Sequence, residues 1–167
     1  MLGLLEGAAC AAELEAAILR EGPETVAGFV FEPVVGAAGG CVPAPEGYAK
    51  AVREICSRYG VLMISDEVMS GAGRCGTWRA LEHDGVEPDI MSVAKGLAGG
   101  YQPLGAAICT TKVWEAIRAA RHAMQAVTGR IRGYAADDPE LHARVSEIVV
   151  HPEGFAVGDA PARLKLL

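Results

Sequence analysis

The chain has 167 residues, a net charge of -6 and 51% hydrophobic residues. A chain of this length can form one domain around its own core, and its apolar content excludes an intrinsically disordered protein. The excess of 21 acidic over 15 basic residues argues against nucleic acid or an anionic membrane as a partner. Since the sequence shows neither a membrane-spanning run nor the basic start of a signal peptide, we expect a cytoplasmic protein.

A helix and a buried strand are predicted first. Apolar residues recur at helical spacing over about residues 11–20, and Gly22 and Pro23 end this pattern. The run Val26–Phe31 is short, apolar and rich in β-branched and aromatic residues, which is typical of a buried strand. The glycines and prolines of residues 36–45 then indicate a loop.

A second helix and a second strand follow this loop. One apolar stripe runs along the helix that begins at Pro45 and ends before Gly60. The run Val61–Ser65 is the next buried strand. Because a helix connects two buried strands, the strands are predicted to be parallel neighbours in an α/β sheet.

Two further strands are predicted at Asp89–Val93 and Ala106–Cys109. The first of them is expected to extend the parallel sheet. The connection between the two is a short Gly-rich turn over 96–105, so the last strand is expected to run antiparallel to its neighbour. A further helix is predicted over 112–120. Beyond it the pattern weakens: a helix is indicated near 138–147, and irregular chain is expected after it.

Cysteine and histidine residues give no sign of a disulfide framework or a metal site. The five cysteines are odd in number and contain no C-x-x-C pair. The four histidines lack the short spacing that metal ligands have. We therefore expect no bound metal, and cysteines that are reduced and buried or inert.

A G-x-G-x-x-G pattern lies at Gly71–Gly76. In dinucleotide-binding folds these glycines end a strand and open a helix, and an acidic residue follows about 20 positions later. Here four residues separate Asp66 from the first glycine, and the next strand is followed by Lys95 instead of an acid. The pattern therefore does not indicate a nicotinamide cofactor.

A carboxylate and an amine follow two neighbouring predicted strands. Asp66 comes directly after one strand and Lys95 shortly after the next, and small residues surround both. The carboxyl ends of parallel strands are where α/β sheets bind ligands. The pair suits pyridoxal phosphate, which forms a Schiff base with a lysine and pairs its protonated ring nitrogen with an acid. Either residue taken singly also fits a surface or helix-capping role.

The chain around this pair is similar to a known family. Two segments, Met63-Ile-Ser-Asp-Glu-Val-Met-Ser-Gly-Ala-Gly-Arg-Cys-Gly76 and Pro88-Asp-Ile-Met-Ser-Val-Ala-Lys-Gly-Leu-Ala-Gly-Gly-Tyr-Gln-Pro-Leu-Gly105, resemble the cofactor-lysine signature of class III pyridoxal-phosphate-dependent aminotransferases. The resemblance covers about residues 13–118. It implies part of the large domain of the fold-type I transferase architecture, in which helices flank a mostly parallel sheet with one antiparallel strand.

The resemblance also implies roles for individual residues. Lys95 would be the catalytic lysine that forms the Schiff base, and Asp66 would pair with the pyridine nitrogen. Val68 would pack on one face of the cofactor ring or be an ordinary core valine, and Glu32 would lie on the substrate side. The implied reaction is amino transfer between an amine or amino acid and a 2-oxo acid or aldehyde, by an enzyme that is a homodimer in the intact family.

The sequence departs from that family in length. Members are considerably longer, and their upstream half supplies a phosphate-binding segment and a ring-stacking aromatic residue without counterparts here. We therefore expect residues 1–120 to be a partial large domain of a truncated product, and 121–167 an unassigned tail. Any bound cofactor would be held weakly, through Lys95. Two alternatives stay open: a non-catalytic fragment or subunit-pairing remnant, and an aminomutase that shares the lysine and aspartate chemistry.

Overall fold

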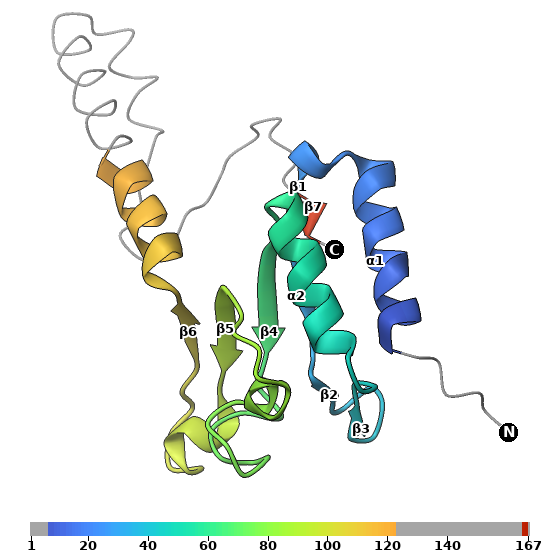
Figure 1. Ribbon diagram of the computed structural model, residues 1–167. Helices are drawn as coiled ribbons and strands as arrows, with labels where there is room; N and C mark the ends of the chain where they lie inside the picture. Colours follow the sequence, from blue (N-terminus) through green and yellow to red (C-terminus); the bar gives the residue numbers. More distant parts are fainter. Residues whose placement is uncertain (1–6, 123–164, 167) are drawn as a thin grey trace, which may run out of the picture. The chain divides into compact units, whose positions relative to one another are not determined.

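The computed structural model describes residues 7–122 and 165–166 (Figure 1). They belong to two units: the first holds the described residues up to Thr110 together with 165–166, and the second holds 111–122. The helical elements of the first unit are α1 (Gly7–Glu21), η1 (Pro23–Thr25), α2 (Tyr48–Tyr59), η2 (Ala80–Asp84) and η3 (Lys95–Ala98). Its strands are β1 (Val26–Phe31), β2 (Val34–Val35), β3 (Val42–Pro43), β4 (Leu62–Asp66), β5 (Ile90–Val93), β6 (Ala106–Cys109) and β7 (Lys165–Leu166).

A mixed sheet with the strand order β6-β5-β4-β1-β7 forms the centre of the first unit. β1, β4 and β5 run parallel, and Phe29 pairs with Met63 while Ser65 pairs with Met91. β6 is antiparallel to β5. The predicted α/β fold, mostly parallel with one antiparallel strand, is therefore confirmed. β7 lies parallel to the other side of β1, where the sequence indicates irregular chain.

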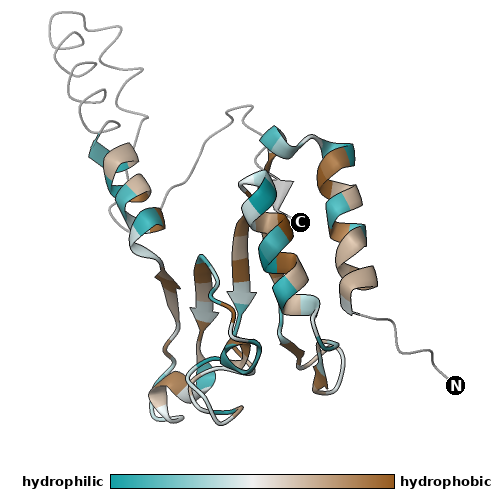
Figure 2. Cartoon of the chain, viewed as in Figure 1, coloured by the Kyte–Doolittle hydropathy of each residue, from teal (hydrophilic) through white to brown (hydrophobic). Residues whose placement is uncertain are grey.

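Two helices cover one face of this sheet. α1 and α2 pack against each other, and α2 also contacts β4 (Figure 1). Hydrophobic and hydrophilic residues alternate along α2, as Figure 2 shows, because the helical repeat returns its apolar residues to the side that faces the sheet. The core contains Ile18, Val52 and Met63, each 0% exposed. Burial of each such side chain contributes about 1.5–3 kcal/mol.

One carboxylate ties α2 to the start of β5. Asp89 Oδ2 accepts a hydrogen bond from Arg53 Nη1 at 2.7 Å and another from the Met63 backbone N–H at 2.8 Å. The Asp89 N–H in turn donates to the Met63 carbonyl at 2.8 Å. Asp89 therefore fixes the chain between β4 and β5 as well as the helix above it.

The predicted strands agree with the structure to within one residue, but other elements differ. α1 begins at Gly7, because the alanines at 8, 9, 11 and 12 are strong helix formers that an apolar repeat does not reveal. α2 begins at Tyr48, because Gly47 adopts a left-handed φ of 79° just before it. Within the predicted loop over 36–45, residues 42–43 form β3, which pairs antiparallel with β2 so that Val34 lies opposite Pro43.

The second unit contains a helix over residues 111–122, which confirms the helix predicted at 112–120. The helix predicted near 138–147 lies outside the described residues. Within the described part of the chain, no helix combines the length and apolar character needed to cross a membrane.

Candidate functional site

Two of the predicted site residues lie at one edge of the sheet. Asp66 is the last residue of β4, and Lys95 stands two residues beyond the end of β5, at the start of η3. β4 and β5 are parallel neighbours, with Asp66 opposite Ser92. The fold therefore places the carboxylate and the amine at the carboxyl edge of adjacent strands, where α/β sheets bind ligands.

Asp66 is held from two directions. Its Oδ1 accepts a hydrogen bond from the Val68 backbone N–H at 3.0 Å and another from the Ser92 hydroxyl at 3.1 Å. Asp66 and Val68 are both half-buried. The two bonds come from the following loop and from the adjacent strand, so they orient the carboxylate against the end of the sheet.

Lys95 has an unusual backbone conformation. Its φ is 48°, in the left-handed region that residues with a side chain rarely adopt. The side chain is exposed, and its Nζ lies in contact with Met69 Sδ. Such backbone strain concentrates at functional sites, because there the position of a side chain outweighs its conformational cost.

Glu32 lies in the loop after β1, which packs on Met69 near the same edge of the sheet. The Glu32 side chain follows β1, and its Oε2 accepts a hydrogen bond from the Gly36 N–H at 3.0 Å. A Cβ atom on Gly36 would lie 2.5 Å from Met69 Cγ, so the loop after β1 packs closely on the loop after β4. Because Met69 also contacts Lys95, this methionine connects the loop that holds Glu32 with the lysine.

Glu67, the residue after Asp66, has no part in the sequence prediction and is completely buried. Its carboxylate accepts hydrogen bonds from the hydroxyls of Ser70 at 2.5 Å and Ser65 at 3.4 Å. It also accepts bonds from the N–H groups of Ala80 at 2.9 Å and Leu81 at 3.2 Å. One signal points to this burial: side chains alternate along a strand, so Glu67 falls on the same face as the buried Ser65.

The glycine-rich loop forms a closed turn. The Ala72 N–H donates to the Trp78 carbonyl at 2.9 Å, and the Gly73 N–H donates to the Thr77 carbonyl at 3.1 Å. The helical element that follows before β5 is the five-residue η2. The G-x-G-x-x-G pattern therefore lacks the strand-to-helix context of a dinucleotide site.

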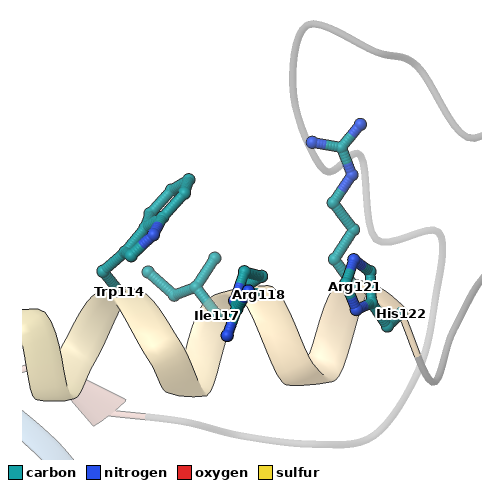
Figure 3. Close-up of a pocket in the computed structure, with 5 residues that line it drawn as sticks. All are labelled: Trp114, Ile117, Arg118, Arg121 and His122. Carbon is teal, nitrogen blue, oxygen red and sulfur yellow. The ribbon is translucent and has the colours of Figure 1, made fainter.

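A surface hollow lies on the helix of the second unit (Figure 3). It is lined by Trp114, Ile117, Arg118, Arg121 and His122, whose spacing places them along one side of that helix. It holds none of the predicted site residues. In the described ranges 7–122 and 165–166, no group of His, Cys, Asp and Glu could hold a metal ion.

Comparison with known proteins identifies the family. The profile described as Aminotransferase class-III matches residues 4–127. An uncharacterized aminotransferase of Schizosaccharomyces pombe is 57% identical over 98 residues, which make up 59% of this chain and 21% of that protein. The diaminobutyrate–2-oxoglutarate transaminase of Halomonas elongata is 49% identical over 108 residues, which make up 65% of this chain and 23% of that protein.

Solved structures give the same result. The omega transaminase of Pseudomonas jessenii in complex with PMP has a TM-score of 0.68 and 37% identity, over 75% of this chain and 28% of its own. The chain thus spans about a quarter of the length of the proteins that it matches. Because the family profile matches most of its length, this chain belongs to the class III aminotransferase family.

Proposed function

We propose that this chain carries the cofactor-lysine segment of a pyridoxal-phosphate-dependent aminotransferase. The reaction would transfer an amino group between a small amine or amino acid and a 2-oxo acid or aldehyde. The observation that carries the proposal is the placement of Asp66 and Lys95 at the carboxyl ends of adjacent parallel strands, inside a segment that matches the family.

The residues at this edge fit the cofactor that the family uses. When bound, pyridoxal phosphate supplies an aldehyde carbon that bonds amines and a ring that withdraws electrons. Lys95 presents an exposed amine to such an aldehyde. Asp66 presents a carboxylate whose two hydrogen bonds both go to Oδ1, so Oδ2 takes neither of them. Amine and carboxylate thus follow adjacent strands and lie at the same edge of the sheet.

Each residue then has a separate role. Lys95 would hold the cofactor through Nζ and, once a substrate amine replaces it, would carry the substrate proton on the same atom. Asp66 would accept a hydrogen bond from the protonated ring nitrogen and favour its charged form. Val68 would pack on one face of the ring. Glu32, tied through Oε2 to the Gly36 N–H, would lie on the substrate side.

The chain spans only a small part of its relatives, and this favours a second candidate function. The chain covers 21% and 23% of two relatives, so most residues of those proteins lie outside the matched segment. The second candidate is therefore a non-catalytic fragment whose half-sheet pairs with another subunit. The two candidates differ in one property, which is whether Lys95 reacts selectively with the cofactor.

Reductive trapping tests the proposal. The chain is mixed with pyridoxal phosphate and treated with borohydride, which makes the bond between lysine and cofactor permanent, and the labelled peptides are mapped by mass spectrometry. We expect the label at Lys95 in excess over the exposed Lys50 and Lys112, and its loss in Lys95→Ala. Equal labelling of the three lysines, or an unchanged yield in Lys95→Ala, would favour the fragment.

A further inference from the structure

Glu67 is an isolated charge inside the described core. The buried polar side chains there are Ser65, Glu67 and Ser70, and Glu67 is the ionisable one, at 0% exposure. A buried carboxylate is costly unless hydrogen bonds replace its lost water. Four donors do so here: the two serine hydroxyls and the N–H groups of Ala80 and Leu81. So complete a set of donors indicates that this position requires a carboxylate.

The carboxylate closes a long loop onto its own start. Glu67 opens the segment after β4, and its backbone donors lie 13 and 14 residues later, at the start of η2. Inside the loop, the bond between Ala72 and Trp78 brings its two sides together. The closure thus joins the two ends of the segment 67–81.

The closed loop packs against the turn that carries the lysine. A Cβ atom on Gly71 would lie 2.8 Å from the Glu67 carbonyl oxygen and 3.5 Å from Val93, the last residue of β5. A Cβ atom on Gly96 would lie 3.5 Å from both Cβ and O of Ala72. The loop therefore lies close to both sides of the strained residue Lys95: the strand end before it and the glycine after it.

We propose that Glu67 is a positioning residue for Lys95. By closing the loop 67–81, its carboxylate holds Ala72 against Gly96 and so keeps the lysine turn in its left-handed conformation. This inference rests on the proposed function only for its effect on cofactor binding. The link that we propose between the loop and the turn rests on their proximity in this structure alone.

The isosteric variant Glu67→Gln tests whether closure of the loop needs the charge and the four acceptor sites of the Glu67 carboxylate. The serine hydroxyls can rotate and become acceptors, but the Ala80 and Leu81 N–H groups can only donate. These two N–H groups bond to different oxygens of the Glu67 carboxylate. In glutamine an amide NH2 replaces one of the oxygens, so one of the two N–H groups faces another donor unless the side chain moves. The loop then loses at least one hydrogen bond to a charged acceptor. The equilibrium constant for opening of the loop should therefore rise by about tenfold or more.

Hydrogen exchange measured by mass spectrometry tests the link between the loop 67–81 and the lysine turn in the absence of cofactor. In Glu67→Gln we expect faster exchange, by about tenfold or more, in 71–81 and also in η3, whose turn the Leu97 and Gly99 N–H groups close. Amides of α2 should keep the parental rate, which shows that the fold persists. The matched control is Glu82→Gln, which changes an exposed carboxylate next to the loop; its Oε1 accepts a bond from the Arg79 N–H, and the amide oxygen of glutamine can also accept that bond.

The trapping experiment reads the effect on Lys95. In Glu67→Gln, the excess of label at Lys95 over Lys50 should fall several-fold, while Glu82→Gln should match the parent. An unchanged excess, or exchange in η3 that stays at the parental rate while the loop opens, would overturn the positioning role. If the parent labels its lysines equally, the proposed function fails, and the exchange data still decide whether Glu67 holds the turn.

A milder variant covers the case in which Glu67→Gln unfolds. Ser70→Ala removes a single donor, the hydroxyl that bonds Glu67 Oε2, and keeps the carboxylate. We expect smaller accelerations in the same two segments, with α2 unaffected. If η3 and α2 accelerate equally in Ser70→Ala, Glu67 supports the whole fold instead of the lysine turn, and the proposal is wrong.

Discussion

The two faces of the central sheet differ in what covers them and in what they carry. On the face beneath α1 and α2, Met63 is 0% exposed, whereas Val30 on the opposite face is 39% exposed. The strand register places Asp66 on the Val30 side, and alternation sends Glu67 to the Met63 side. Neighbouring carboxylates therefore have different environments. One is enclosed and fixes a loop, and the other is half-buried at the candidate site.

Truncating one residue on each face tests this difference most strongly. We expect Met63→Ala to lower the free energy of unfolding by about 2–5 kcal/mol, because it leaves a cavity in the packed core. Val30→Ala, on the more exposed face, should lower it by about 1 kcal/mol or less. Urea unfolding followed by circular dichroism measures both. Equal losses would mean that the two faces are equally packed.

Removing Asp89 tests the polar link between the helical layer and the sheet. In Asp89→Ala the Met63 N–H and the Arg53 guanidinium lose their shared acceptor, so we expect a loss of about 1–3 kcal/mol in unfolding free energy. Glu87→Ala is the control. The Glu87 side chain forms an ion pair with Arg79, but it is 79% exposed. That variant should change stability by about 1 kcal/mol or less.

Thiol reactivity compares the enclosed region with the surface. Cys56 is fully buried, and burial raises the pKa of its thiol to about 11, whereas Cys41 is exposed. We expect a thiol reagent at pH 8 to modify Cys41 quickly and Cys56 only on unfolding, as peptide mapping will show. Comparable rates at the two sites in the folded protein would contradict the enclosed position of Cys56.

The same thiol predicts a pH dependence. The unfolded thiol ionises near its ordinary pKa of 9 and the folded one near 11, so its contribution to stability is present below 9 and lost as pH rises from 9 to 11. Thermal unfolding across this range should show a smaller decline for Cys56→Ala than for the parent. A parallel decline in both proteins would assign the loss to other groups.

The smallest effect is expected at the surface between the helices. The Tyr59 hydroxyl donates to Glu15 Oε1 at 2.8 Å, and this bond, with help from Arg58, lowers the pKa of Glu15 below its ordinary 4.5. The stabilisation is therefore present above pH 4.5 and lost as pH falls through the lower folded value. Glu15→Gln should remove this acid-side change in melting temperature, and Glu13→Gln, an exposed neighbour, should retain it.

The sequence predicts those features of the fold that depend on local pattern. The runs around Val30, Met63 and Met91 have the apolar, β-branched character of buried strands, and the helix between the first two requires parallel pairing. The positions of Asp66 and Lys95 at one edge follow directly from that pairing. The family resemblance then narrows the chemistry that such a pair can perform.

Other features depend on contacts between residues far apart in the chain. The backbone donors to Glu67 lie 13 and 14 residues away, and no local sequence pattern predicts them. The contact of Gly36 with Met69 joins two loops from different strands, and only the folded chain shows how close they come. The hairpin β2–β3 has two residues in each strand, too few to produce a visible alternation.

The left-handed backbone of Lys95 has a consequence for natural selection. A residue with a side chain incurs about 1–2 kcal/mol in this conformation, and glycine avoids that penalty. The substitution Lys95→Gly should therefore make the fold more stable while it removes the amine. A chain under selection for stability alone would drift towards glycine here, and the proposed function supplies a reason for a lysine to occupy this strained position.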